Sequence, residues 1–561
     1  LGSYLLDITS GLWTSSEVLD TIFGTEPPTM DPSLATDSQS IWSIRQMFMG
    51  LTGFDENAQV VPALATEWSV SDDGLVWTYT MRNDVPWVKY NAETGEVEML
   101  RNVTAQDVEY AVKRTLDPRT ASDYSYLLYL LAGGEEFNTA DPASADLDAL
   151  ADAVGVKALD DTTVEFTLTA PAGYFPSVTG LWITFPQNQE AVEAGGDLWA
   201  DAGTIVTNGP FTLAQWDHGA YVQMVKNPHW PDAANVQIEA IQGPIIESES
   251  TAMAMYEANE IDIMAGTLGW APPLPDMDRI KADPVLSEEL YIAPQLCTYY
   301  YGFVMTKAPM DNPLVRKALS AAIDRQSLID NVVKGGQLPA HSFSPPGIFG
   351  NVADDPEIGA WMVQEDFAAQ LEQAKAWMTE AGYPEGAGID LLLMHNTSEA
   401  HAQIMQAIQA MWATAFPQAT FTVENQEFQV YLNTLLPDAP DEDKPHVFRL
   451  GWCADYPDAN NWLNEVFHSS SGSNRPKYNN PEFDALVEQA AFEADSAVRE
   501  DLYRQAEAIF AEDAPIAPIY YYTFVRMYKP WLTNVVISPV TGDPVYLWTM
   551  DVEAKAAARG Q

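Results

Sequence analysis

The sequence predicts an α/β protein with more than one domain. The chain has 561 residues, which is more than a single hydrophobic core usually serves. Runs typical of β-strands alternate with amphipathic helical patterns, and this alternation favours sheets that are covered by helices. Hydrophobic residues make up 47% of the chain, which is enough to form packed cores and argues against disorder.

Strand patterns dominate the first third of the chain. The run 18–23 is strand-like, 75–82 follows an Asp73-Gly74 turn and is rich in β-formers, and 164–168 alternates in the same manner. Between them Thr104, with an acid three residues later, predicts the start of a helix. The apolar face of this helix would be formed by Val108, Ala111, Val112 and Leu116.

Helical patterns dominate the second half. Asn312 followed by Pro313 predicts a helix start, because proline is favoured at the first helical position. Further helices fit residues 367–381, 401–415, 481–494 and 498–512. Short apolar runs at 389–394 and 421–423 lie between them and fit strands.

The charge of the chain excludes several classes of partner. The formal net charge is −53. A field of this sign repels phosphate backbones, so we expect no nucleic-acid partner.

The sequence has no run of about 18 apolar residues, so it predicts no transmembrane helix.

Motifs for catalysis or metal binding are not found. The sequence has no GxSxG elbow, phosphate-binding glycine loop or HExxH, and the seven histidines form no close ligand pair. We therefore expect neither an enzyme nor a cofactor or metal, although two of the many carboxylates could stand at glycosidase spacing by chance. The two cysteines, Cys297 and Cys453, predict either one disulfide or two buried thiols.

The segment 449–456 combines an arginine, an acid, an aromatic residue and a cysteine. If it is extended, Arg449 and Asp455 project to the same face, roughly 20 Å apart at ~3.3 Å per residue. Such a pair suits a ligand with a cation at one end and an anion at the other, for example a short peptide. The alternative is an ordinary surface strand with unrelated charges.

Several motifs in combination resemble the periplasmic oligopeptide-binding proteins, the peptide and nickel class of ABC-transporter solute receptors. They include Glu26-Pro27-Pro28-Thr29-Met30-Asp31-Pro32, Thr207-Asn208-Gly209-Pro210-Phe211, Lys226-Asn227-Pro228-His229-Trp230 and Gly451-Trp452-Cys453-Ala454-Asp455-Tyr456. The resemblance runs from about residue 18 to residue 548.

The resemblance implies a two-lobed periplasmic-binding-protein fold with an extra inserted subdomain and a ligand cleft between the lobes. The first lobe would comprise 1–56, 200–296 and 522–561, the inserted subdomain 57–199, and the second lobe 297–521. It also implies a short peptide ligand, an ABC-transporter membrane permease as partner, and a monomer. The location would be periplasmic or extracellular, either free or lipid-anchored.

The resemblance also implies roles for individual residues. Cys297 and Cys453 would form a disulfide, and Asp455 would hold the peptide ammonium, unless it is an exposed acid at a strand end. Arg449 would receive the peptide carboxylate, unless it belongs to a structural salt bridge. Pocket residues are expected at Gly451, Trp452, Cys453, Tyr300 and Tyr522. The loop around Asp37 and Ser38 would form a strand that pairs with the peptide backbone.

Two departures from the family pattern leave the ligand's side chains undefined. Gly302 stands where an acid is frequent, and Gln295 replaces an aromatic residue. The seventeen tryptophans also leave open an oligosaccharide receptor of the same fold. A peptidase or a glycosidase is the third alternative.

Overall fold

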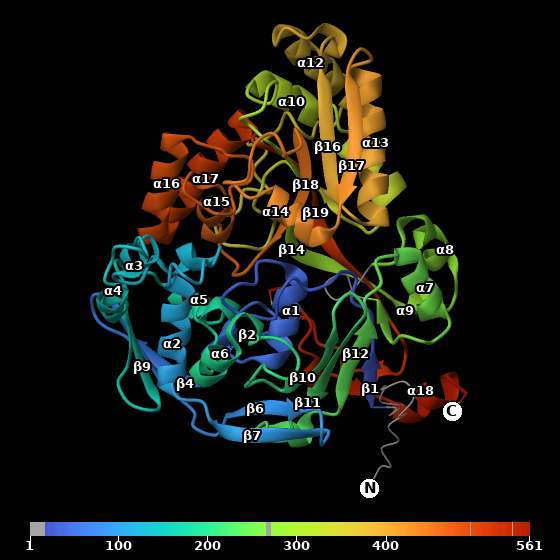
Figure 1. Cartoon of the computed structure of the whole chain (residues 1–561). Helices are drawn as coiled ribbons and strands as arrows, with labels where there is room; N and C mark the ends of the chain where they lie inside the picture. Colours follow the sequence, from blue (N-terminus) through green and yellow to red (C-terminus); the bar gives the residue numbers. More distant parts are fainter. Residues whose placement is uncertain (1–16, 265–270, 494, 541, 561) are drawn as a thin grey trace. The chain divides into compact units, whose positions relative to one another are not determined.

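The computed structural model describes residues 17–264, 271–493, 495–540 and 542–560 (Figure 1). The chain divides into two compact units: unit 1 comprises residues 1–271 and 526–561, and unit 2 comprises residues 272–525. The finer predicted division, with a subdomain over 57–199 and a second lobe from 297, stays a prediction. In the described part of the chain, no helix is long and apolar enough to cross a membrane.

Unit 1 contains two four-stranded sheets. The first has the order β1-β12-β11-β10, in which β1 (Val18–Asp20) is parallel to β12 (Ala240–Pro244) and the other pairs are antiparallel. The second is antiparallel throughout, in the order β4-β5-β9-β8. The remaining strands of these sheets are β10 (Phe211–Asp217), β11 (Tyr221–Lys226), β4 (Ala65–Val70), β5 (Val76–Met81), β9 (Thr163–Thr167) and β8 (Val156–Ala158).

Two-stranded pairings and short helices complete unit 1. The strand pairs are β2 (Thr52–Phe54) with β3 (Val60–Pro62), β6 (Pro86–Asn91) with β7 (Glu96–Asn102), and β20 (Leu532–Thr533) with β21 (Thr549–Met550). The α-helices are α1 (Ser38–Met47), α2 (Ala105–Leu116), α3 (Gly134–Asn138), α4 (Leu147–Ala153), α5 (Phe175–Val178), α6 (Gln189–Gly195), α7 (Glu249–Glu257) and α18 (Val552–Ala558).

The predicted helix after Thr104 is confirmed. Helix α2 begins at Ala105, and the Asp107 carboxylate accepts a hydrogen bond from the backbone N–H of Thr104 at 2.9 Å. This contact satisfies a donor that the first helical turn leaves open. The strands predicted at 75–82 and 164–168 correspond to β5 and β9, whereas the run 18–23 forms a strand only over Val18–Asp20.

Unit 2 is built on one mixed sheet, whose strands follow the order β19-β14-β18-β16-β17. Strand β16 is parallel to both of its neighbours, and β14 is antiparallel to β18. The strands are β14 (Leu290–Phe303), β16 (Asp390–Asn396), β17 (Thr420–Gln426), β18 (Val447–Cys453) and β19 (Ile516–Tyr528), with β15 (Leu338–Pro339) paired to β19. The last residues of β19 belong to unit 1, where they pair with β13 (Ile263–Met264).

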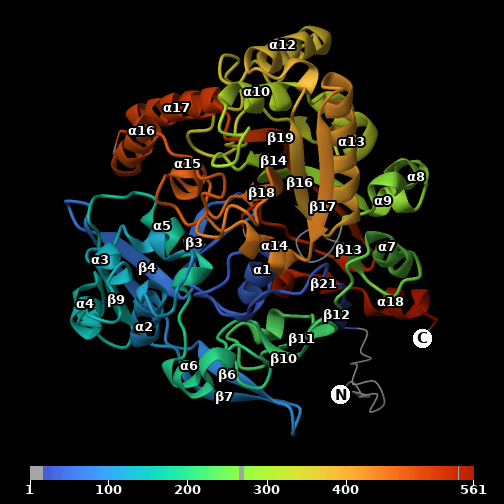
Figure 2. The same ribbon diagram turned by 45° about the horizontal axis from the view of Figure 1, so that its top comes forward.

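Helices cover both faces of this sheet (Figure 2). One core contains apolar residues of α10 (Pro313–Ala321), α12 (Phe367–Glu380) and α13 (Glu399–Ala415), together with Tyr299 and Tyr301 of β14. The other core contains Tyr300, Phe448 and Leu450 and residues of α14 (Phe428–Thr434), α15 (Asn460–Phe467), α16 (Pro481–Phe492) and α17 (Ser496–Asp513). The described part of unit 2 also contains the short α-helices α8 (Met277–Ala282), α9 (Leu286–Glu289) and α11 (Arg325–Leu328).

The helices predicted in this half of the chain are confirmed, with ends that move by at most two residues. The Asn312 side chain accepts a hydrogen bond from Leu314 N at 3.0 Å, and Pro313 is the first residue of α10. The strands predicted at 389–394 and 421–423 are the parallel neighbours β16 and β17. Alternation of strands and helices in the sequence therefore corresponds to a helix-covered sheet.

Candidate ligand-binding site

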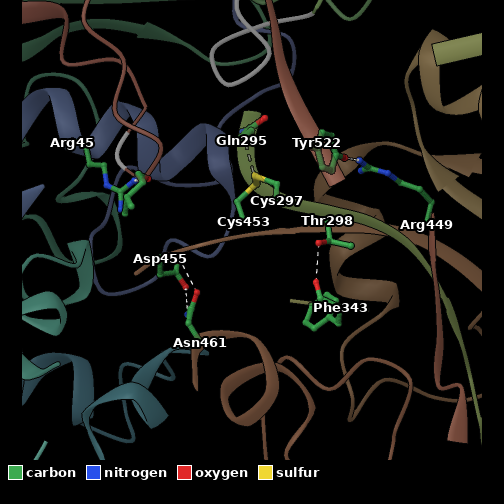
Figure 3. The surroundings of a disulfide bond; sticks show 11 residues. Arg45, Gln295, Cys297, Thr298, Phe343, Arg449, Cys453, Asp455, Asn461 and Tyr522 are labelled. Atoms are coloured by element: carbon green, nitrogen blue, oxygen red, sulfur yellow. Dashed lines mark hydrogen bonds between the residues drawn. A yellow bond between two sulfur atoms is a disulfide. The ribbon is translucent and has the colours of Figure 1, made fainter. Parts of the chain in front are cut away.

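The candidate site of unit 2 lies along the pairing of β14 with β18. Cys297 lies directly opposite Cys453 in the antiparallel register, and the two form a disulfide (Figure 3). The predicted disulfide is thus present. The same register places Tyr301 opposite Arg449 and Tyr299 opposite Gly451.

Alternation along β18 separates its side chains into two sets. Because successive residues of a strand point to opposite faces, Arg449, Gly451 and Cys453 share the face of Tyr299 and Tyr301. Trp452 points the other way and packs against the core that contains Tyr300 and Leu450. We predicted that Arg449 and Asp455 share a face if the chain between them is extended. Strand β18 ends at Cys453, two residues before Asp455, so that argument does not reach Asp455.

Arg449 is a buried cation with neutral partners. Only 8% of its surface is exposed. Its Nη2 donates to the Tyr522 hydroxyl at 2.6 Å, its Nη1 donates to Asn396 Oδ1 at 3.3 Å, and its guanidinium lies 4.5 Å from the centre of the Tyr299 ring. Among the residues that the structure describes, no carboxylate pairs with Arg449, and its Nε has no hydrogen-bond partner. The predicted alternative of a structural salt bridge therefore receives no support from the described contacts.

The backbone around Arg449 is held by Tyr431 of α14. The Tyr431 hydroxyl accepts a hydrogen bond from Arg449 N at 2.9 Å and lies 2.7 Å from Arg449 O and 3.1 Å from Met394 O, both of which can accept its proton. These contacts tie β18 to β16 just beyond Phe448, where the direct pairing of the two strands ends. Strand β18 continues from Arg449 to Cys453 without further direct pairing to β16.

Two histidines near Arg449 are kept neutral. Burial, with a smaller contribution from the positive charge of Arg449, lowers the pKa of His401 well below its usual value. Burial also lowers the pKa of His395, and Arg449 again contributes. His401 Nδ1 lies 3.4 Å from the Tyr299 hydroxyl, whereas His395 Nδ1 lies 2.8 Å from Asn396 O. The surroundings of Arg449 are thus polar, buried and short of negative charge.

Asp455 lies in the turn after β18, next to the first turn of α15 (Figure 3). It is 8% exposed. Its Oδ2 accepts a hydrogen bond from Asn461 Nδ2 at 2.9 Å, and its backbone N–H donates to Asn461 Oδ1 at the same distance. The predicted alternative of an exposed acid at a strand end is wrong, because the carboxylate is buried and oriented by an amide.

The remaining predicted residues of unit 2 have different surroundings. Tyr522 contacts Arg449, and a Cβ added to Gly451 would lie 3.0 Å from the Tyr522 hydroxyl. Glycine at 451 therefore leaves room for that contact. Tyr300, by contrast, is 1% exposed and packs its ring edge-on against Phe343. The site residue on β14 that touches Arg449 is its neighbour, Tyr299.

Sequence reasoning missed Tyr299, Asn396, His401 and Tyr431. For Tyr299 a signal was present: a disulfide between Cys297 and Cys453 puts the odd-numbered tyrosines on the face of Arg449. The departure at Gly302 also has a local cause. A Cβ there would lie 2.0 Å from the Phe448 ring, which fills the space in the core.

The strand predicted around Asp37 and Ser38 in unit 1 is wrong. Ser38 is the first residue of α1, and Asp37 is its N-cap, whose Oδ1 accepts from Gln39 N at 2.9 Å and from Ser40 N at 3.0 Å. Aspartate is a favoured N-cap because its carboxylate satisfies the open donors of the first turn. Whether either residue contacts a ligand stays a prediction.

Comparison with known proteins shows the family of the chain. Residues 59–474 match the model of the bacterial extracellular solute-binding proteins, family 5. The chain is 32% identical to the oligopeptide-binding protein OppA of Bacillus subtilis, over 92% of this chain and 90% of that protein. The structure of the murein tripeptide-binding protein MppA of Escherichia coli matches with a TM-score of 0.84 at 30% identity, over 96% of this chain and 99% of that one. The structure of Haemophilus influenzae OppA in complex with the peptide RPPGFSPFR matches with a TM-score of 0.81 at 28% identity, over 95% of this chain and 99% of that one.

Proposed function

This chain belongs to family 5 of the bacterial extracellular solute-binding proteins, and from that premise we propose that it binds short peptides for import. The single observation that carries the proposal is Arg449, a buried guanidinium that has no carboxylate partner among the described residues. A buried unpaired charge is costly, so such a group is favourable where a ligand supplies the opposite charge. The carboxylate of a peptide is an anion of the right geometry, since a guanidinium binds both of its oxygens.

The surroundings of Arg449 suit an anion. Asn396 is the last residue of β16, and ligands of open α/β sheets bind beyond the carboxyl ends of the strands. The Tyr299 ring and the Tyr522 hydroxyl fix the guanidinium, and its Nε has no hydrogen-bond partner in the part of the chain that the structure describes. A ligand carboxylate beside Arg449 would also favour protonation of the two neutral histidines.

Asp455 provides the opposite charge for the amino end of the peptide. An ammonium bound to this buried carboxylate would form a charge-assisted hydrogen bond. Between the two charges, the backbone from Leu450 to Cys453 lies beyond the last direct pairing with β16, and an extended peptide could add to it there through main-chain hydrogen bonds. Side chains of such a peptide would then lie near Gly451, Trp452 and Cys453.

The family places the protein outside the cytoplasm, and its members are binding proteins. A peptide receptor of this type delivers its ligand to the membrane permease of an ABC importer. Within this proposal the bound peptide is released unchanged, and the receptor is either free or held at the membrane by a lipid anchor. The oligosaccharide alternative gains nothing from the relatives reported above, which are named for peptides.

The test is calorimetry with trialanine, its N-acetyl form and its C-terminal amide, with cellotriose as the control ligand. We expect trialanine to bind and both blocked forms to bind at least tenfold more weakly. Asp455→Asn keeps the shape of the side chain and removes its charge, so it should abolish the difference between free and acetylated peptide. Binding of cellotriose without binding of any peptide would refute the proposal. Mass spectrometry of the ligand after prolonged incubation would detect cleavage, which we do not expect.

A further inference from the structure

Asp455 belongs to a buried polar network that includes a second carboxylate. Asn461 Nδ2 donates to Asp455 Oδ2 at 2.9 Å and lies 3.4 Å from Glu465 Oε2, so one amide bridges two acids. Its Oδ1 accepts from Asp455 N, which determines the orientation of the amide. Asn461 is fully buried, and Glu465 is 7% exposed. The bridge therefore couples Glu465 to the carboxylate that we assign to the ligand ammonium.

Glu465 is surrounded by neutral donors. The Tyr456 hydroxyl donates to its Oε1 at 2.5 Å, and Asn460 Nδ2 donates to the same atom at 3.1 Å. Within the described residues no lysine or arginine forms an ion pair with Glu465. When Glu465 is ionised, its carboxylate therefore has no compensating cation among the described contacts.

The other charged and titratable groups near Glu465 are engaged elsewhere. Arg499 of α17 forms a two-pronged ion pair with Asp458, at 2.7 and 2.8 Å. The Tyr503 hydroxyl is 3.4 Å from Asn460 Oδ1. Asp455 and Asp458 are the acids that act on Glu465.

We propose that Glu465 is a positioning residue of the ammonium anchor, which orients Asp455 through Asn461 and releases a proton when a cationic amino group binds. This inference rests on the proposed function of Asp455. No covalent bond changes, and the proton passes from the Glu465 carboxyl to solvent. The affinity for a peptide with a free amino end should then increase with pH.

The physical reason is that two carboxylates in one buried site cannot both ionise at low cost. Burial, followed by the charge of Asp455, raises the pKa of Glu465 to about 8. At neutral pH the empty protein therefore holds a proton on Glu465. A ligand ammonium adds a positive charge to the cluster, which lowers the pKa of Glu465 and displaces that proton.

The experiment is titration calorimetry of the full chain with trialanine between pH 5.5 and 7.5, in pairs of buffers that differ in ionisation enthalpy. This window lies below the α-amino pKa of about 7.7–8.0, so most of the ligand is cationic throughout. For the wild type we expect affinity to rise with pH, by at most about tenfold per unit if one proton is fully displaced. Glu465→Gln should bind with similar affinity at pH 5.5 and fall behind the wild type as pH rises.

Matched variants separate this effect from other titrations. His395 and His401 titrate in the wild type and in Glu465→Gln alike, so the difference between the two proteins reports Glu465. Tyr456→Phe removes a hydrogen bond that lowers the pKa of Glu465, and it should move the affinity rise to higher pH. If Glu465→Gln does not fold, Tyr456→Phe and the number of protons that the wild type releases on binding test the role of Glu465.

Failure of the role of Glu465 and failure of the proposed function give different results. Peptide binding with the same pH profile in the wild type and in Glu465→Gln, or without proton release in the wild type, would overturn the role of Glu465 and leave the proposed function intact. Failure of the wild type to bind any peptide at any pH would overturn the proposed function itself.

Discussion

The Tyr522 hydroxyl lies 2.6 Å from Nη2 of Arg449, on the face of the unit 2 sheet that also carries Tyr299. This contact joins β19 to β18 across the intervening strand β14. Together with Asn396 and the Tyr299 ring, it orients the guanidinium. Orientation before binding reduces the entropy that a ligand must offset.

Arg449→Met should remove most of the affinity for peptides with a free carboxylate. The methionine fills much of the same volume, so the main loss is a buried charge pair. Breaking such a pair costs about 3–5 kcal/mol, which corresponds to a loss of more than 100-fold in affinity. Calorimetry with trialanine would measure it.

The amidated peptide is the control for this prediction. It lacks the carboxylate, so its affinity should change much less between the wild type and Arg449→Met. Equal losses for both peptides would mean that Arg449 supports the site structurally and does not contact the ligand.

Gly451→Ala should destabilise the protein through its contact with Tyr522. A Cβ at position 451 would lie 3.0 Å from the Tyr522 hydroxyl. Alanine is otherwise preferred to glycine within a strand by about 0.5–1 kcal/mol. We therefore expect Gly451→Ala to lower the free energy of unfolding in the wild type and to raise it in a Tyr522→Phe background, as measured by urea denaturation. Additive effects of the two substitutions would show that the close approach costs nothing.

His401 should make the protein less stable as the solution becomes more acidic. Its pKa in the folded state lies well below the usual 6.5, because of burial and then the Arg449 charge. Between the pKa of His401 in the folded state and that in the unfolded state, the unfolded chain binds more protons. The contribution of His401 to the free energy of unfolding is therefore complete above pH 6.5 and declines as the pH falls below it.

The test compares the wild type with His401→Gln in urea at pH 5, 6, 7 and 8. The raised pKa of Glu465 has the opposite effect, and it is present in both proteins. The difference in unfolding free energy between the two proteins should shift in favour of the variant as pH falls. A constant difference would contradict the assignment.

Removing the disulfide should lower stability substantially. Cys297 and Cys453 are 156 residues apart in sequence, and the loop-entropy model gives about 5 kcal/mol for a loop of this length. We expect the Cys297→Ser, Cys453→Ser double variant to melt at a lower temperature. Reduction of the wild type with dithiothreitol should produce the same shift, and an unchanged melting temperature in both cases would contradict it.

Features that depend on neighbours in sequence could be predicted from the sequence alone. Helix α2 begins after Thr104, and α10 begins at Pro313, because the capping contacts lie within three residues of the helix start. The alternation of strands and helices likewise predicted the helix-covered sheet of unit 2. The N-cap at Asp37 is a local signal of the same kind, and it was misread as a strand.

Only the tertiary structure decided which side chains meet. The register of β14 against β18 places Tyr299, and not Tyr300, beside Arg449, although the two strands are separated by more than a hundred residues. The end of β18 at Cys453 turns Asp455 toward Asn461, so an extended-chain argument fails there. The physical reason is that a one-residue change in register or in strand length moves a side chain to the other face, and long-range packing sets both.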